Sequence, residues 1–200
     1  MKRICTILIM ALMTFPVLLK AQSATDTVPY CCNFENQVEM ALWRFANTSG
    51  GNRWIINSAT QNGVGINSMY ISNDGISHNY SNTQSYSYAM RRLHIPAGVY
   101  EVTYDWVANG YSSATYAYLR VFLIPATAQF AGGQQYAGLS ATTLPTGAIS
   151  LDRGNALLLQ SSWTTFNDPI VHVPTTNDYF LDFSGTTILP WALRTSHRQP

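Results

Sequence analysis

Few residues of this 200-residue sequence have the type and spacing that catalysis would require. Its four histidines are scattered, and no zinc-peptidase, serine-hydrolase or phosphate-loop motif occurs. Cys32 with a distant His and Asp could form a nucleophilic triad, but no spacing singles these residues out. Carboxylate pairs for glycoside hydrolysis are defined by separation in space, so the sequence leaves them open. We therefore predict that the chain has no catalytic residues, while a longer parent protein could still be an enzyme.

Aromatic side chains in or beside predicted loops are the better candidates for function. Amphipathic rings at such places can stack on a sugar or anchor a protein partner. The alternative is that they cover the rim and edges of a sheet. The candidate ligand-binding residues are Tyr111, Tyr116, Tyr136 and Trp163.

The two cysteines outside the N-terminal segment, Cys31 and Cys32, are neighbours in the chain. Adjacent Cα atoms lie about 3.8 Å apart, below the usual disulfide range of about 4.4–6.8 Å. We expect one cysteine to point inward as a small apolar residue and the other to face outward. A reactive pair or an intermolecular bridge stays open.

The first 21 residues have the features of a secretory signal peptide. Lys2 and Arg3 precede an apolar run over residues 4–19, and cleavage is expected after Ala21. A membrane anchor is the weaker alternative, since the run is shorter than the roughly 20 residues of a span. No later segment is apolar enough to cross a bilayer. Residues 22–29 form a polar lead-in.

Removal of the signal leaves eight arginines, no lysine and ten acids, a formal charge of 8 − 10 = −2. Such a surface lacks the basic patch that nucleic acid or anionic lipid requires. The length that remains suits one domain.

Short alternating segments separated by turn signals predict an all-β, two-sheet antiparallel β-sandwich. The clearest strand places Tyr100, Val102, Tyr104 and Trp106 on one face. A helix is expected only over Gln37–Phe45, and residues 126–150 should form a long loop. The expected strands are Cys32–Asn36, Arg53–Ile56, Ile66–Ser72, Tyr86–Leu93, Val99–Val107, Tyr116–Ile124, Ala156–Gln160, Ile170–Val173 and Tyr179–Phe183.

The alternation also separates buried from exposed positions on these strands. Asp105 and Asp182 fall on the faces opposite the apolar residues, so we expect them to face solvent or to anchor turns. The residues expected in the core are Tyr104, Trp106, Leu119, Val121 and Leu181.

The order of motifs from residue 29 to 184 resembles the MAM-like and cleaved-adhesin-like jelly-roll modules of secreted Gram-negative proteins. The segment Ile95–Tyr100, running into Tyr104-Asp105-Trp106, is similar to the "Pro-x-Gly-x-Tyr … Phe-Asp-Trp" strand of these modules. The opening at residues 29–35 and the strand over residues 118–125 also match. Trp163, followed by residues 170–173 and 179–183, resembles the closing section. The resemblance implies a jelly roll exported through a Gram-negative envelope.

The resemblance also implies a structural calcium site near the first strand, with Glu35 as a ligand. Calcium takes six to eight oxygen ligands. The sequence departs from the family at Asn33, which replaces an acid, and at the end, where the closing strand with its acidic ligand is not recognisable. We therefore expect an irregular tail over residues 185–200, a truncated or frame-shifted chain, and an unpaired edge at residues 33–36.

These observations predict an exported, non-catalytic binding or adhesion module that recognises a glycan or a protein at the cell surface. The alternative is an accessory domain of a longer exported hydrolase, a peptidase or glycoside hydrolase. Fold alone does not name the ligand.

Overall fold

The computed structural model describes residues 26–108, 117–187 and 191–194, with the side chains of 187 and 191–194 excepted. Almost all of its regular structure is β, in two sheets, which confirms the predicted β-sandwich. Sheet A has the order β1-β5-β10-β7-β8, and β2 also pairs with β5. Its strands are β1 (Asp26–Thr27), β2 (Arg44–Ala46), β5 (Ser85–Ile95), β7 (Tyr118–Pro125), β8 (Ile149–Ser150) and β10 (Asn177–Thr187).

Sheet B has the order β3-β4-β11-β6-β9. All of its pairings are antiparallel, whereas sheet A contains one parallel pair, β1 with β5. Its strands are β3 (Arg53–Asn57), β4 (Ser68–Ser72), β6 (Gly98–Ala108), β9 (Gln160–Val173) and β11 (Trp191–Arg194).

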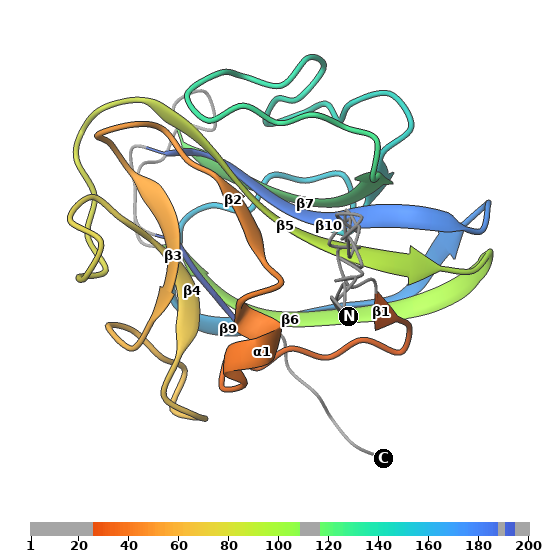
Figure 1. Cartoon of the computed structure of the whole chain (residues 1–200), viewed down its shortest axis with the longest axis horizontal. Coiled ribbons are helices and arrows are strands. Elements are labelled where there is room, and N and C mark those ends of the chain that lie inside the picture. Colours follow the sequence, from red (N-terminus) through yellow and green to blue (C-terminus); the bar gives the residue numbers. More distant parts are fainter. Residues whose placement is uncertain (1–25, 109–116, 188–190, 195–200) are drawn as a thin grey trace, which may run out of the picture.

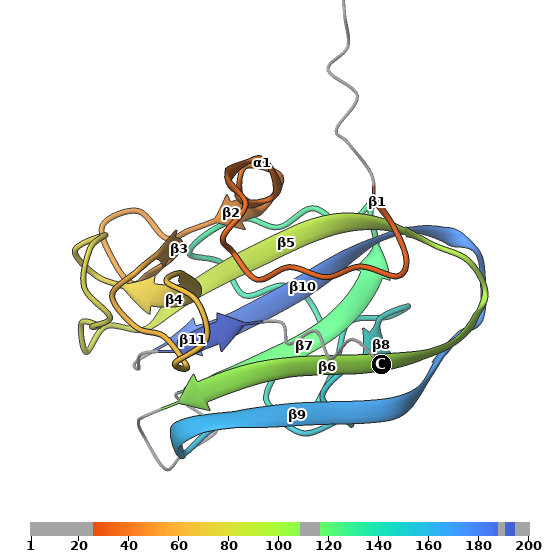
Figure 2. The same cartoon turned by 90° about the horizontal axis from the view of Figure 1, so that it is seen from below.

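Two tight connections carry the chain from one sheet to the other. β5 passes into β6 through Pro96 and Ala97, and β9 passes into β10 through residues 174–176. Figure 2 shows both connections at the same end of the molecule, with β5 and β10 above β6 and β9. The two sheets therefore share one closed end, and their inner faces meet in a common core.

The main core lies between the sheets and contains the residues that alternation predicted to be inside. Tyr104, Trp106, Leu119, Val121 and Leu181 are all buried, as predicted. The pattern succeeds here because each of their strands presents a single face to the opposite sheet. Further large side chains in this core are Phe34, Trp43, Trp54, Met69, Ile71 and Phe183.

A second buried layer covers the outer face of sheet A. The long segment 126–148 packs on this face over Tyr88, Phe122 and Phe180; it is the loop above β7 and β10 in Figure 1. Asp182 points into this layer and is fully buried. The expectation that Asp182 faces solvent or anchors a turn is therefore wrong, because the face opposite the main core is itself covered by chain.

The segment before β2 differs from the prediction in two ways. Residues 31–36 form no strand, since Phe34 has a left-handed backbone with φ 59° and packs on Trp43 with ring centroids 5.6 Å apart. Asn36 then caps a one-turn helix, α1 (Gln37–Met40), by accepting from Val38 N at 2.9 Å. The predicted helix to Phe45 is too long, because Arg44–Ala46 pairs with β5 as β2.

The C-terminal half also corrects the sequence-based picture. Residues 156–159 form no continuous strand, since Leu159 has φ 54°, and only Leu157 makes an isolated bridge to Leu119. β9 begins at Gln160 and joins the predicted strand Ile170–Val173 in one long element. An irregular tail from residue 185 is wrong as well, because β10 continues to Thr187 and β11 lies between β4 and β6. Residues 33–36 form no strand, so the expected unpaired strand edge there is wrong. β11 does not pair with residues 32–36, and a truncated or frame-shifted chain stays a prediction.

The predicted signal peptide, residues 1–21, lies outside the described residues and stays a prediction. The polar lead-in is only partly described, and it contributes β1. No helix in the described ranges is long and apolar enough to span a membrane.

Candidate functional site

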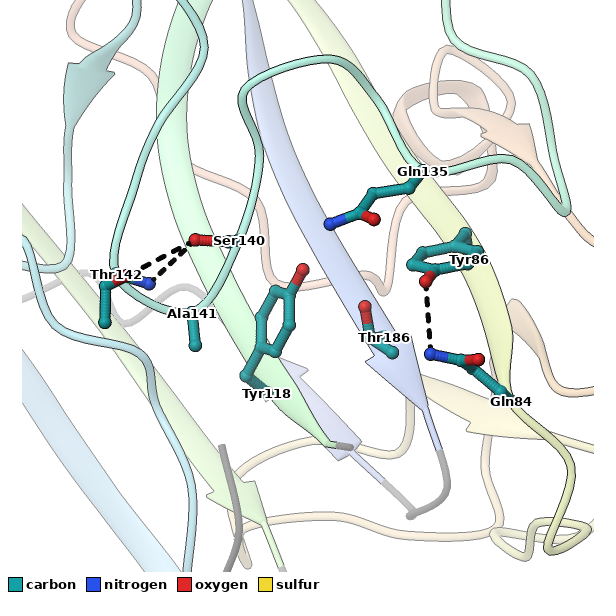
Figure 3. Close-up of a pocket in the computed structure, with 8 residues that line it drawn as sticks. All are labelled: Gln84, Tyr86, Tyr118, Gln135, Ser140, Ala141, Thr142 and Thr186. Carbon is teal, nitrogen blue, oxygen red and sulfur yellow. Dashed lines mark hydrogen bonds between the residues drawn. The ribbon is translucent and has the colours of Figure 1, made fainter. Parts of the chain in front are cut away.

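A polar pocket of about 360 Å³ opens on the outer face of sheet A, beside the 126–148 loop. That volume lies at the lower end of the range of about 300–1,000 Å³ for small-molecule sites. Its floor comes from three neighbouring strands, because Thr186 on β10 is paired with Tyr86 on β5 and with Tyr118 on β7. Figure 3 shows Thr186 between the two tyrosine rings.

The lining offers aromatic faces together with hydroxyl and amide groups. Gln84 and Gln135 are exposed side chains at the rim, and Gln84 Nε2 donates to the hydroxyl of Tyr86 at 3.1 Å. Burial raises the pKa of the Tyr118 hydroxyl, which therefore stays protonated at neutral pH. None of the described residues that line it is charged. The full lining is Gln84, Tyr86, Tyr118, Gln135, Ser140, Ala141, Thr142 and Thr186.

The wall at residues 140–142 is fixed from below by a buried ion pair. Arg120 Nε and Nη2 donate to the two carboxylate oxygens of Asp152 at 2.6 and 3.1 Å, and both side chains are at most 1% exposed. The remaining nitrogen, Nη1, donates to the carbonyls of Ser140, Ala141 and Thr143 at 3.0–3.2 Å. The guanidinium group thus holds three carbonyls of the wall and determines where this wall lies.

The other end of the loop is held by close backbone packing. A Cβ atom on Gly132 would lie 1.9 Å from the carbonyl oxygen of Asn47, so only glycine fits there. Gly133 N donates to Tyr86 O at 2.8 Å, which ties the loop to β5 at a pocket residue. The amide of Tyr136 donates to the hydroxyl of Tyr88 at 2.9 Å. These contacts place Gln135 over the pocket (Figure 3).

The described aromatic candidates lie on opposite faces of the molecule. Tyr136 is half-buried on the outer face of sheet A, where its ring packs on Phe130 at 4.5 Å, next in sequence to pocket residue Gln135. Trp163 is half-buried against Tyr70 and Val107 on sheet B. The structure does not bring these two rings together. Tyr111 and Tyr116 lie outside the described residues.

Glu35 anchors a neighbouring loop. One carboxylate oxygen accepts from Ile66 N at 2.6 Å and Asn67 N at 3.0 Å, and the other accepts from Asn67 Nδ2 at 3.0 Å. A calcium ion would have to compete with these donors for the same lone pairs. Within ranges 26–108, 117–187 and 191–194, no three His, Cys, Asp or Glu side chains group to hold a metal. The calcium site stays a prediction.

The adjacent cysteines behave as their spacing predicts. Cys32 is buried in the main core, Cys31 is exposed, and neither forms a disulfide.

No pattern in the sequence marks the pocket residues. Thr186, Gln84 and Gln135 have no motif, and they come together only through the β5-β10-β7 pairing and the returning loop. One signal was present: Arg120 interrupts the apolar run of residues 118–125. A charged residue inside a buried strand requires a partner, and here that partner lies under the pocket wall.

Comparison with known proteins gives resemblance at the level of solved structures. No family model and no curated protein matches the sequence. The C-terminal family 22 carbohydrate-binding module of Clostridium thermocellum Xyn10B is similar at 13% identity, with a TM-score of 0.44, 84% of this chain covered and 90% of that chain. The carbohydrate-binding module TmCBM61, solved with β-1,4-galactotriose, has 10% identity and a TM-score of 0.40, with 80% and 91% covered.

The K1 cleaved adhesin domain of the Porphyromonas gingivalis Lys-gingipain is similar at 15% identity and a TM-score of 0.44, with 83% of this chain and 94% of that chain covered. All of these TM-scores are below 0.5.

Proposed function

We propose that this chain is a non-catalytic binding module that holds a carbohydrate in the pocket on the outer face of sheet A. The observation that carries the proposal is the lining itself. Two tyrosine rings, two carboxamides and three hydroxyl side chains converge on one uncharged cavity of about 360 Å³.

These lining groups suit a neutral sugar better than an anionic ligand. A neutral sugar presents a row of hydroxyls, which amides and hydroxyls can bind as both donors and acceptors. Its C–H faces pack on aromatic rings such as Tyr86 and Tyr118. An anionic ligand would need a cation, and none lines the pocket. The buried Arg120 beneath the wall is already neutralised by Asp152.

The proposal also covers the location of the module and its relatives. We place the module outside the cell or on its surface, because of the signal-like N-terminus and the lysine-free remainder. Kinship with the cleaved-adhesin-like modules, and a role as an accessory domain of an exported hydrolase, stay proposals of the same kind.

The test is a glycan array followed by calorimetric titration of the strongest ligand. Gln84→Ala and Gln135→Ala remove exposed rim amides without opening the core, and each should weaken binding about tenfold or more. Gln129→Ala is the matched control, since Gln129 is exposed on the same loop and bonds only locally, to Thr127 O at 3.2 Å.

Two outcomes would contradict the site. Binding that none of these variants changes would place the ligand elsewhere. Loss with Tyr111→Ala or Tyr116→Ala, while both glutamine variants bind normally, would favour the loop tyrosines predicted from the sequence.

A further inference from the structure

A second cleft, unrelated to the sugar pocket, lies at the margin of the sandwich between segment 28–31 and β6. Its volume is about 840 Å³. Leu93, Leu123 and Leu181 of sheet A line it from one side, and Val102 and Val171 of sheet B line it from the other. It is therefore an opening into the apolar space between the sheets.

The cleft lies beside an edge of β6 that the described residues cover only in part. β11 pairs with Asp105–Ala108 alone, and no described residue pairs with Gly98–Tyr104 on that side. Val102, on the inner face of β6, and Glu101 and Thr103, on its outer face, line the same cleft. The cleft therefore reaches both faces of β6 beside the edge that no described residue covers. An uncovered edge presents backbone donors and acceptors for another strand.

The register of β11 defines what such a strand would contact. Trp191 pairs with Ala108 and Arg194 with Asp105, so the antiparallel register continues towards Gly98. An added strand in this register would place alternate side chains opposite Tyr100 and Val102, inside the apolar cleft. The intervening side chains would lie opposite Glu101 and Thr103, on the outer surface.

The exposed carboxylate of Glu101 indicates which charge a partner strand should carry. Glu101 is exposed, and its carboxylate accepts from Asn167 Nδ2 at 2.6 Å but forms no ion pair within the described residues. A basic residue directly opposite Glu101 would give a favourable cross-strand pair.

We propose that this cleft binds an extended peptide of a partner protein by strand addition to β6. The peptide carries apolar residues at the inward positions and Lys or Arg opposite Glu101. Main-chain hydrogen bonds to the β6 edge supply affinity, and the alternate apolar side chains supply specificity.

The chain's own residues 195–200 fit the same register less well, by sequence. They would bring Arg198 opposite Glu101 but would place polar Thr195, His197 and Gln199 at the inward positions. A peptide with valine at those positions would bury apolar side chains instead, which favours a separate partner.

The experiment titrates the full-length protein with a synthetic nine-residue peptide. The peptide has valine at the inward positions, lysine opposite Glu101 and threonine at the other outward positions. We expect micromolar binding, about −8 kcal/mol by the standard conversion. The same peptide with its edge-facing amides N-methylated should lose about tenfold or more, because it cannot complete the ladder. Glu101→Lys should weaken the lysine peptide and restore a glutamate peptide, and this exposed substitution leaves the core intact.

Three results would overturn the proposal. The first is that the N-methylated peptide binds as tightly as the unmodified one, or that a fatty acid displaces the peptide. Either outcome would mean that the cleft binds apolar ligands without strand addition. The second is binding that does not respond to the Glu101 charge swap. The third is binding only after deletion of residues 195–200, which would make the chain's own end the occupant. None of these results bears on the sugar pocket, because the two sites share no lining residue.

Discussion

At the scale of single residues, the pair Arg120 and Asp152 connects stability to the proposed site. Both side chains are fully enclosed, and their polar groups are bonded to each other, to backbone groups and, at Asp152 Oδ1, to the hydroxyl of Ser150. A buried ion pair contributes little when intact but is costly to break, because a lone buried charge remains. The same arginine holds the carbonyls of the pocket wall.

We predict that Arg120→Met lowers the free energy of unfolding by about 3–5 kcal/mol. Urea denaturation measures this loss. Arg153→Met is the matched control, since Arg153 is 55% exposed and lies 3.7 Å from Asp168, and it should cost about 1 kcal/mol or less. Similar losses of unfolding free energy in the two variants would show that the burial of the Arg120–Asp152 pair does not raise the cost of breaking it.

The buried carboxyl group of Asp182 makes the stability of the fold depend on pH. Burial raises its pKa to about 8, while Ser184 donates to one carboxylate oxygen and the other has no hydrogen-bond partner in the structure. In the unfolded chain the pKa is about 3.9. The folded state therefore binds one more proton than the unfolded state between about pH 4 and pH 8.

It follows that this group makes the protein progressively less stable as pH rises through that window. Asp182→Asn removes the titration, so we expect the variant to exceed the wild type in melting temperature at pH 8 by more than at pH 5. Thermal melts at the two pH values test this, with Asp178→Asn as the control on the same strand. Asp178 is half-buried, and its hydrogen bonds to His94 and Arg92 lower its pKa, so it stays ionised at both pH values. An equal difference at both values would mean that Asp182 is ionised in the folded protein.

At the scale of elements, alternation was a reliable guide wherever a strand has one buried and one solvent-facing side. The strand over Tyr100–Trp106 and its inward residues were predictable for that reason. β10 was not, because the 126–148 loop covers its second face and buries Asp182. The sequence of that loop, rich in Ala, Gly, Gln and Thr, carries no periodic pattern that shows where it docks.

The short strand β11 was not predicted, for a related reason. β11 occupies only four residues, and its partners β4 and β6 lie far away in sequence. Pro190 before it argued against a strand, although a proline is tolerated immediately outside one. Non-local pairing outweighed the local signal in this case.

Trp106→Ala tests the core of the sandwich. Trp106 is 9% exposed and lies on β6 between the sheets. Truncation should cost about 3–5 kcal/mol of unfolding free energy, the transfer loss plus the cavity left behind. A cost below about 1 kcal/mol in chemical denaturation would mean that this position does not support the core.

Gly132→Ala tests whether the loop is positioned by its contact with Asn47. The added methyl group would collide with backbone, so the loop must move. We predict weaker sugar binding with a melting temperature close to that of the wild type, because the main core is untouched. Gly51→Ala is the control, since Gly51 has no left-handed φ and its added methyl group would make only ordinary contacts, the nearest to Thr48 Cγ2 at 3.6 Å. Normal binding by Gly132→Ala would show that the loop does not form the site.

At the scale of the whole molecule, the fold keeps two kinds of surface apart. The outer face of sheet A carries a pocket whose described lining is uncharged, and the margin beside β6 carries an apolar cleft next to an edge that no described residue covers. The rigid two-sheet core supports the pocket and the cleft at separate places on the surface. A module of this build could hold a glycan and a protein partner at the same time.

The most direct test of the central proposal is to locate the bound sugar on the folded domain. The best array ligand is titrated into isotope-labelled protein, and backbone and side-chain amide NMR shifts are followed. The account predicts saturable shifts at Gln84, Tyr86, Tyr118, Gln135, Ser140–Thr142 and Thr186, with little change on sheet B. Shifts confined to Trp163 and sheet B, or no shift with any array ligand, would contradict it.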